Sequence, residues 1–152
     1  MALEQSFVGR EYPPESVYEV GREKIREFAE AIGDPRPEYL DVEAAKALGY
    51  ADVVAPPTFT TIVNLASINR IVNDPELGLD YSRMVHGDQS FTHHSPVVAG
   101  DRLAVTTVVE SISRRAGNDF ITLKAEIRTD AGEPRVTTRA LLVVRDAEEG
   151  QA

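Results

Sequence analysis

The clearest pattern in the chain is an alternation of apolar and polar residues in its second half. Between residues 121 and 128 every second residue is apolar: Ile121, Leu123, Ala125 and Ile127. Alternation with a period of two is typical of a strand with one buried face and one wet face. The same criterion, together with glycine-containing connections, predicts strands at 89–94, 102–113, 119–129 and 135–145. Connections this short favour antiparallel hairpins.

The first half of the chain instead carries helical spacing. A helix over residues 22–32 is predicted by the repeat of Ile25, Phe28, Ala29 and Ile32. A shorter helix is predicted at 42–48, and Gly33 and Gly49 are expected to end these two helices. Thr58 is expected to cap a long helix that reaches residue 72. Apolar residues cover most of this long helix, so we expect a sheet to wrap it.

Helices followed by a run of strands predict an α+β fold, in which a curved antiparallel sheet wraps a long apolar central helix. A chain of 152 residues with 42% hydrophobic residues suits one domain, which we predict to span residues 1–146. Residues 147–152 are expected to form a disordered acidic tail.

Composition excludes several classes of function. The net charge of -9 and the absence of a basic run argue against a nucleic-acid partner. The chain has no cysteine, which excludes disulfides, thiolate nucleophiles and cysteine-bound zinc. It also has no secretory-type N-terminal pattern and no apolar run long enough to span a bilayer. These features predict a cytoplasmic protein without a membrane partner.

Three segments together resemble one known family. They are FAEAIGDPRPEY at 28–39, VVAPPTF at 53–59 and FTHHSPVVAGD at 91–101. In this order and spacing they resemble the MaoC-like hot-dog family, which includes the N-terminal MaoC dehydratases and the hydratase 2 enzymes. The chain is similar to the non-catalytic subunit of actinobacterial (3R)-hydroxyacyl-ACP dehydratases. The resemblance implies a single hot-dog fold that dimerises and an acyl-thioester ligand.

The resemblance also implies where catalytic residues would stand. In the family a loop of the form Gly-Asp-x-Asn-Pro-x-His supplies an acid and a histidine that together hold the reacting water. Asp34 occupies the acid position, but Tyr39 replaces the histidine. A phenol with a pKa of about 10 stays protonated at neutral pH and cannot share the role of general base. The alternative for Asp34 is a turn residue that bonds to nearby backbone.

The family places a glycine, whose N–H faces the thioester carbonyl, near the position of Pro57, and proline has no N–H to donate. The N–H of Thr58 and the helix dipole remain as donors. We expect Pro57, Thr58, Phe59 and His93 to contact the substrate. His93 shares the predicted core face of its strand with Phe91. Since adjacent strand residues point to opposite faces, His93 and His94 are not expected to share a metal ion. We predict neither a metal site nor a cofactor.

We therefore interpret the chain as the acyl-thioester-binding subunit of an (R)-specific enoyl hydratase or (3R)-hydroxyacyl dehydratase, without a complete catalytic dyad. Its expected partners are an acyl-CoA or acyl-ACP and a second hot-dog subunit, in a homodimer or in a heterodimer with a catalytic MaoC-like chain. One alternative is a self-sufficient hydratase or thioesterase that uses Asp34 with a partner such as His93. Another is a regulatory acyl-CoA-binding module. Arg36, Arg70 and Arg83 would suit a carrier phosphate if they cluster.

Overall fold

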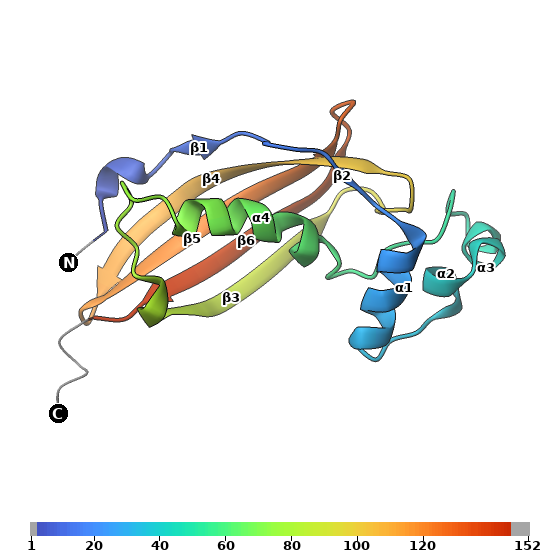
Figure 1. Ribbon diagram of the computed structural model, residues 1–152, viewed down its shortest axis with the longest axis horizontal. Coiled ribbons are helices and arrows are strands. Elements are labelled where there is room, and N and C mark those ends of the chain that lie inside the picture. The colour runs from blue at the N-terminus through green and yellow to red at the C-terminus, as the bar shows by residue number, and fades with distance from the viewer. Residues whose placement is uncertain (1–2, 147–152) are drawn as a thin grey trace.

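An antiparallel sheet and a long helix form the body of the computed structural model, which describes residues 3–146 (Figure 1). The strands are β1 (Glu11–Tyr12), β2 (Tyr18–Glu19), β3 (Met84–His93), β4 (Arg102–Arg115), β5 (Asn118–Thr129) and β6 (Pro134–Val144). The helices are α1 (Arg22–Ala31), α2 (Pro37–Leu40), α3 (Val42–Ala47) and α4 (Thr60–Val72), with single 3-10 turns at Gln5–Phe7 and Tyr81–Arg83. The predicted tail at 147–152 lies outside the described residues.

The sheet confirms two of the predicted hairpins, β4 with β5 and β5 with β6, whereas the hairpin expected between the strands at 89–94 and 102–113 is wrong, because β3 pairs with β6 at the other edge. Its strand order is β1-β4-β5-β6-β3, with β2 also paired to β4, and every pairing is antiparallel. The alternation in β5 is confirmed, because Ile121, Leu123, Ala125 and Ile127 are all buried. β3 starts at Met84, five residues before the predicted start, and β1 and β2 were not predicted. Two-residue strands are too short to show a period.

Helix α4 lies along one face of the curved sheet (Figure 1), which confirms the predicted α+β class. The predicted capping by Thr58 is wrong. Phe59 occupies the N-cap position, and no side chain caps the helix. The physical reason is that the chain already turns before α4, since Phe59 N–H donates to the Pro56 carbonyl and Thr61 N–H to the Thr58 carbonyl. Thr58 itself is exposed.

The sheet covers only one side of α4. Val63, Asn64 and Ile71 are buried against the sheet, whereas Leu65 is 53% exposed and Ala66 is also exposed. The expectation that the sheet wraps the helix therefore holds for one face. The other face is open because a single curved sheet reaches around only one side.

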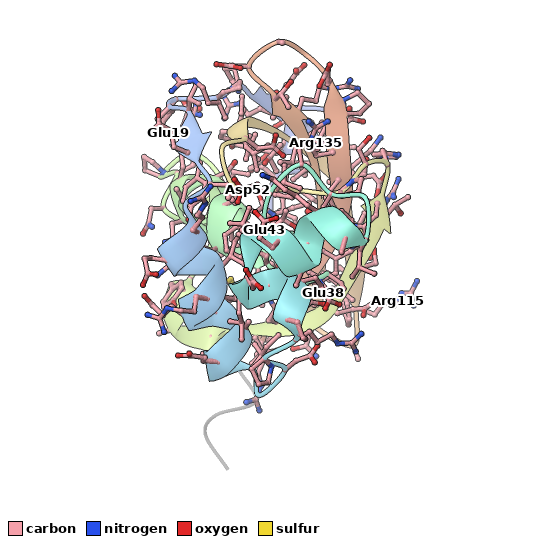
Figure 2. All side chains as sticks on the ribbon, turned by 90° about the vertical axis from the view of Figure 1, so that its right-hand side faces the viewer. Glu19, Glu38, Glu43, Asp52, Arg115 and Arg135 are labelled. Carbon is pink, nitrogen blue, oxygen red and sulfur yellow. The ribbon has the colours of Figure 1, made fainter. Side chains whose placement is uncertain are left out.

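The three short helices gather beyond one end of the sheet (Figure 1). Figure 2, viewed from that end, shows the acidic side chains of Glu38, Glu43 and Asp52 around α2 and α3. The predicted helices α1 and α3 are confirmed, but α2 occupies part of the segment that we predicted as a loop. Pro37 supplies the first residue of α2, where its missing N–H costs nothing.

The core divides into two hydrophobic clusters along α4. The near cluster lies beside α1–α3 and contains Val20, Ile25, Ala29, Tyr39, Val53, Val54, Ala55, Phe59, Val63, Val97, Leu103, Ile127 and Val136. The far cluster contains Leu3, Phe7, Tyr12, Ile71, Val72, Leu77, Val109, Ile112, Ile121, Leu123, Leu142 and Val144.

Small and polar side chains separate the two clusters. Thr107, Ala125 and Thr138 face one another across β4, β5 and β6, and all three are buried. From α4, Asn64 donates to Thr138 Oγ1 at 3.2 Å, and the Ser67 hydroxyl lies 2.7 Å from that of Thr107. These five residues, which we call the polar layer, are Asn64, Ser67, Thr107 and Thr138 with the small side chain of Ala125 between them.

Candidate functional site

A pocket of about 290 Å³ lies where α4 begins and β3 ends. Short backbone pairing builds it: Val54 and Val98 form a β-bridge, Ala55 N–H donates to the Val97 carbonyl, and Ala99 N–H donates to the Val53 carbonyl. This pairing holds the start of α4 against the end of β3. The pocket, which we call the histidine pocket, is lined by Tyr50, Val54, Ala55, Pro56, Pro57, Thr60, His93, His94, Ser95, Pro96 and Val97.

Both His93 and His94 border this pocket. Strict strand alternation would send them to opposite faces, but β3 ends at His93, and the N–H groups of His94 and Ser95 both donate to the Arg135 carbonyl. The chain therefore bends, and both rings reach the same opening. His94 Nε2 lies 2.8 Å from Thr137 Oγ1, which fixes that ring.

Asp34 lies at the end of α1, where the sequence predicted it. Gly33 adopts a left-handed conformation (φ +73°), and the N–H of Asp34 donates to the Ala29 carbonyl. The Asp34 carboxylate accepts a hydrogen bond from Arg36 Nε at 2.9 Å, and its side chain is 39% exposed. Asp34 is not among the residues that line the histidine pocket. Its carboxylate is thus engaged by a neighbour in the same loop.

Tyr39 is buried in the near cluster. Burial raises the pKa of its phenol above the ordinary value; the Arg36 guanidinium opposes this shift, and the Asp34 carboxylate adds to it. The phenol therefore stays protonated at neutral pH. A group in this state can donate a hydrogen bond but cannot accept a proton from water.

The remaining predicted site residues separate in space. Pro57 and His93 line the histidine pocket together. Thr58 is exposed beside it, whereas Phe59 is fully buried, with its ring centroid 5.6 Å from that of Phe28 in an edge-to-face contact. Their roles in substrate binding stay predictions.

Two polar residues of α4 were missed by the sequence interpretation. Thr60 and Asn64 are 2% and 3% exposed, and Thr60 lines the histidine pocket. Thr60 Oγ1 and Asn64 Oδ1 have no hydrogen-bond partner within residues 3–146. Their spacing of four residues, on the face that also carries Ser67, was the sequence signal that could have identified them.

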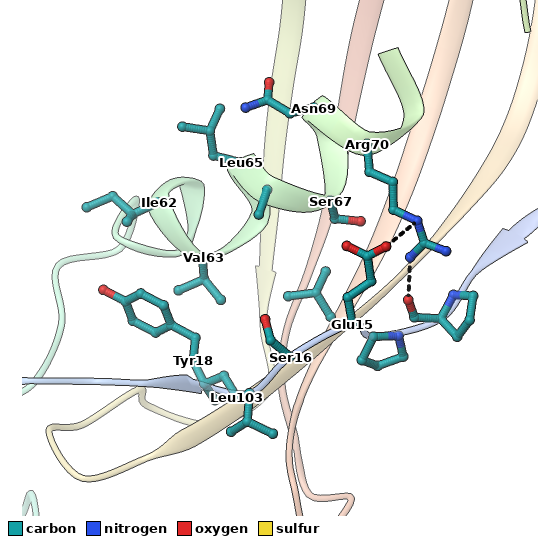
Figure 3. Close-up of a pocket in the computed structure, with 15 residues that line it drawn as sticks. Glu15, Ser16, Tyr18, Ile62, Val63, Leu65, Ser67, Asn69, Arg70 and Leu103 are labelled. Carbon is teal, nitrogen blue, oxygen red and sulfur yellow. Dashed lines mark hydrogen bonds and ion pairs between the residues drawn. The ribbon is translucent and has the colours of Figure 1, made fainter. Parts of the chain in front are cut away.

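A second cavity, of about 390 Å³, lies between α4, β4 and the segment that links β1 to β2 (Figure 3). Tyr18, Val63, Leu65 and Leu103 contribute apolar walls. Arg70 fastens the linking segment to α4 through an ion pair with Glu15 at 3.1 Å and a hydrogen bond to the Pro13 carbonyl (Figure 3). We call this cavity the strap groove.

The three arginines considered for a carrier phosphate are each paired with a different acid. Arg36 pairs with Asp34, Arg70 with Glu15 and Arg83 with Asp80. The part of the chain that the structure describes contains no group of three or more histidine and acidic side chains placed to hold a metal ion. Within residues 3–146, none of the helices has the length and apolar character that a membrane span requires.

Comparison with known proteins identifies the family. Residues 6–138 match the family model described as "FAS1-like, dehydratase domain region". A relative from Streptomyces avermitilis, described as a UPF0336 protein, is 62% identical over 150 residues, which is 99% of this chain and 100% of the relative.

Solved structures agree with this match. A protein described as a MaoC-like dehydratase superposes with a TM-score of 0.88 at 37% identity, over 95% of this chain and 44% of that protein. The (3R)-hydroxyacyl-ACP dehydratase complex HadBC of Mycobacterium tuberculosis has a chain that superposes with a TM-score of 0.82 at 32% identity, over 90% of this chain and 96% of that chain. The resemblance read from the sequence is confirmed.

Proposed function

The chain belongs to the FAS1-like, dehydratase domain region family, and we propose that it is the acyl-thioester-binding subunit of an (R)-specific enoyl hydratase or (3R)-hydroxyacyl dehydratase. In this proposal a sister subunit supplies the catalytic acid and histidine. The ligand would be an acyl-CoA or acyl-ACP. A cytoplasmic location stays a prediction of the sequence.

One observation carries this proposal: the loop that supplies the acid and the histidine in the family lacks the histidine here, and its acid is already paired. Hydration of an enoyl thioester needs a group that takes a proton from water. The Asp34 carboxylate is paired with Arg36 and does not line the histidine pocket, and the buried Tyr39 phenol keeps its proton. Pro57, at the pocket, has no N–H for the thioester oxygen. Binding without efficient turnover is the function that these features support.

The test is an assay of the isolated chain with crotonyl-CoA and longer trans-2-enoyl-CoA substrates, followed by loss of the enoyl absorbance. Loss of a general acid or base lowers rates by about a hundredfold to ten-thousandfold. We expect turnover at least that far below about ten per second, an ordinary enzyme rate. Titration calorimetry with a saturated acyl-CoA should nevertheless detect binding.

The opposite result has a clear form. Turnover near ten per second that disappears in Asp34→Asn would establish a self-sufficient enzyme. The presence of two histidines at the pocket is the observation that favours this second candidate. In that case His93→Gln, at a residue that lines the pocket, should abolish turnover as well.

A second hot-dog chain is part of the proposal, because β3 lies at the edge of the sheet. Residues 85–88 of β3 are exposed, and an exposed edge strand pairs readily with another strand. A related chain of known structure comes from a complex of dehydratase subunits. Light scattering at micromolar concentration should give about twice the chain mass of 16.7 kDa, and a monomer mass alone would count against this assembly.

A further inference from the structure

A largely buried ion pair lies next to the histidine pocket without lining it. Arg135, the second residue of β6, donates to the Asp101 carboxylate through Nε at 3.1 Å and through Nη2 at 3.3 Å. The two side chains are only 14% and 11% exposed, and neither residue is among those that line the pocket. A planar guanidinium that meets a carboxylate through two donors fixes both the distance and the orientation of the two groups.

The backbone of Arg135 holds one part of the pocket wall. Its carbonyl accepts hydrogen bonds from the N–H groups of His94 and Ser95, at 2.8 and 3.2 Å, and both of these residues line the pocket. Since β3 ends at His93, these bonds tie the first two residues beyond the strand to β6. The position of Arg135 therefore determines where this part of the wall lies.

The Asp101 carboxylate holds another part of the wall. Its residue closes a turn, in which the Asp101 N–H donates to the Val98 carbonyl and the carboxylate accepts from the Val98 N–H at 3.1 Å. Gly100 supplies the left-handed conformation within this turn (φ +94°). Val98 is bridged to Val54, which lines the pocket. The carboxylate thus connects the Arg135 side chain to the segment that leads into α4.

Removal of the guanidinium would leave the Asp101 carboxylate buried without its charged partner, which is unfavourable. The carboxylate can reach water only if the turn that carries it moves, and that turn is bridged to Val54. The His94–Ser95 part of the wall would stay with β6, because backbone hydrogen bonds hold it. Loss of the ion pair would therefore change the separation between the two parts of the wall.

We propose that Asp101 and Arg135 are positioning residues of the histidine pocket. Their ion pair sets the separation between the His94–Ser95 segment and the Val54 segment, and through it the affinity for the acyl thioester. This inference rests on the proposed function, because it takes the histidine pocket as the thioester site.

Arg135→Met tests the proposal on the full chain, since methionine keeps an apolar stem but cannot pair with Asp101. Titration calorimetry with octanoyl-CoA should show binding about tenfold weaker than that of the parent, within the loss of up to about a hundredfold that a shift of about 1 Å in a binding group can cause. Arg135→Lys keeps the charge but lacks the planar fork, so its affinity should fall between the two.

The histidines provide a readout that a loss of stability alone does not change. In NMR spectra of the ligand-free chain, the imidazole signals of His93 and His94, which line the pocket, should shift in Arg135→Met. The signal of His86, near the start of β3, should stay as in the parent. Each signal is assigned by replacing one histidine at a time with glutamine.

Arg114→Met is the matched control. Arg114 donates to the buried Asp119 carboxylate at 3.2 and 3.1 Å, near the end of β4 that is opposite to Asp101. This variant also deprives a buried aspartate of a guanidinium partner, so it should lower the urea midpoint. Its affinity for octanoyl-CoA and its three histidine signals should match those of the parent.

A folded Arg135→Met protein with the parental affinity, or with parental His93 and His94 signals, would overturn the inference and leave the ion pair a purely stabilising contact. If circular dichroism shows that Arg135→Met does not fold, Arg135→Lys and Asp101→Asn decide the question by the same two measurements. Failure of the parent to bind octanoyl-CoA would instead reject the proposed function, and the histidine signals would still show whether the ion pair positions the pocket.

Discussion

The far and near clusters of the core are built from the same helix and sheet, but only the near cluster borders a cavity that holds unpaired polar atoms. In the far cluster, apolar side chains such as Ile71, Ile121 and Leu123 are almost completely buried. The near cluster borders the histidine pocket and contains Tyr39, and Asn64 lies at its boundary. The difference indicates that one half of the core supplies stability, while the other half borders the pocket that we propose as the binding site.

The way each half is closed supports this division. Strands β4, β5 and β6 line both clusters through paired backbone, with a register shift between Val109 and Ser111 beside the far cluster. The near cluster is closed by α1–α3, whose buried side chains Ile25, Ala29 and Tyr39 pack into it. The edge-to-face contact of Phe28 with Phe59 adds to this packing. The ion pair of Arg22 with Asp52 lies at the surface of this end, and because exposed ion pairs add little stability, we expect it to contribute little to the attachment.

The largest expected effect belongs to the far cluster. Leu123→Ala removes a side chain that is 1% exposed and leaves a cavity. Such truncations cost about 2–5 kcal/mol of the free energy of unfolding. Urea titration followed by circular dichroism should show this loss, while the affinity of the folded variant for octanoyl-CoA should match that of the parent.

Leu65→Ala is the matched control for this change. Leu65 is 53% exposed on the open side of α4, and surface substitutions usually change stability by less than about 0.5 kcal/mol. A Leu123→Ala protein that keeps its stability but loses acyl-CoA binding would break the proposed division between the two clusters.

The second effect belongs to the near cluster and concerns chemistry. Tyr39→His with Pro57→Gly should raise hydration of enoyl thioesters above the parent, because an imidazole with a pKa near 6.5 exchanges protons at neutral pH and glycine restores a backbone donor. The hydration rate should rise only about tenfold, because the Asp34 carboxylate remains paired with Arg36. This is less than the hundredfold to ten-thousandfold effect that a general acid or base typically contributes.

Two further variants sharpen this prediction. Arg36→Ala in the double variant should increase the gain by freeing the Asp34 carboxylate, and Asp34→Asn should remove it. A double variant that folds, binds octanoyl-CoA and shows no gain would mean that residue 39 does not occupy the position of the family histidine.

The sequence predicted the strands and long helices because their periods extend over many residues. The alternation in β5 and the helical repeat in α1 each span about ten positions, enough to fix both the element and its buried face. The family resemblance predicted the fold and grouped Pro57 with His93, and both residues line the histidine pocket. The hydrophobic periodicity of the two segments gives no indication that these residues are neighbours.

What the sequence could not supply depends on distant contacts. The open side of α4 follows from the curvature of one sheet, and the pairing of Asp34 with Arg36 follows from the local path of the chain after Gly33. The unpaired oxygens of Thr60 and Asn64 become visible only once the opposing residues of β5 and β6 are placed.

The smallest expected effect tests the attachment of α1–α3. The Asp52 carboxylate accepts two hydrogen bonds from Arg22, at 3.0 and 2.8 Å, and this pairing lowers the pKa of Asp52 below its ordinary value. Because the pKa is lower in the folded chain than in the unfolded chain, the stabilisation is complete above the unfolded pKa of about 4 and is lost as the pH falls through the folded value.

Arg22→Ala should therefore lower the urea midpoint slightly at pH 7, by less than Leu123→Ala does, and the difference from the parent should shrink as the pH falls below about 4. Arg115→Ala is the control, since Arg115 is an exposed arginine at the end of β4 that forms no ion pair within residues 3–146. A difference for Arg22→Ala that stays constant down to low pH would assign its effect to packing on α1 rather than to charge. A loss as large as that of Leu123→Ala would show that the near cluster is held as firmly as the far one, and the division of the core would then have to be abandoned.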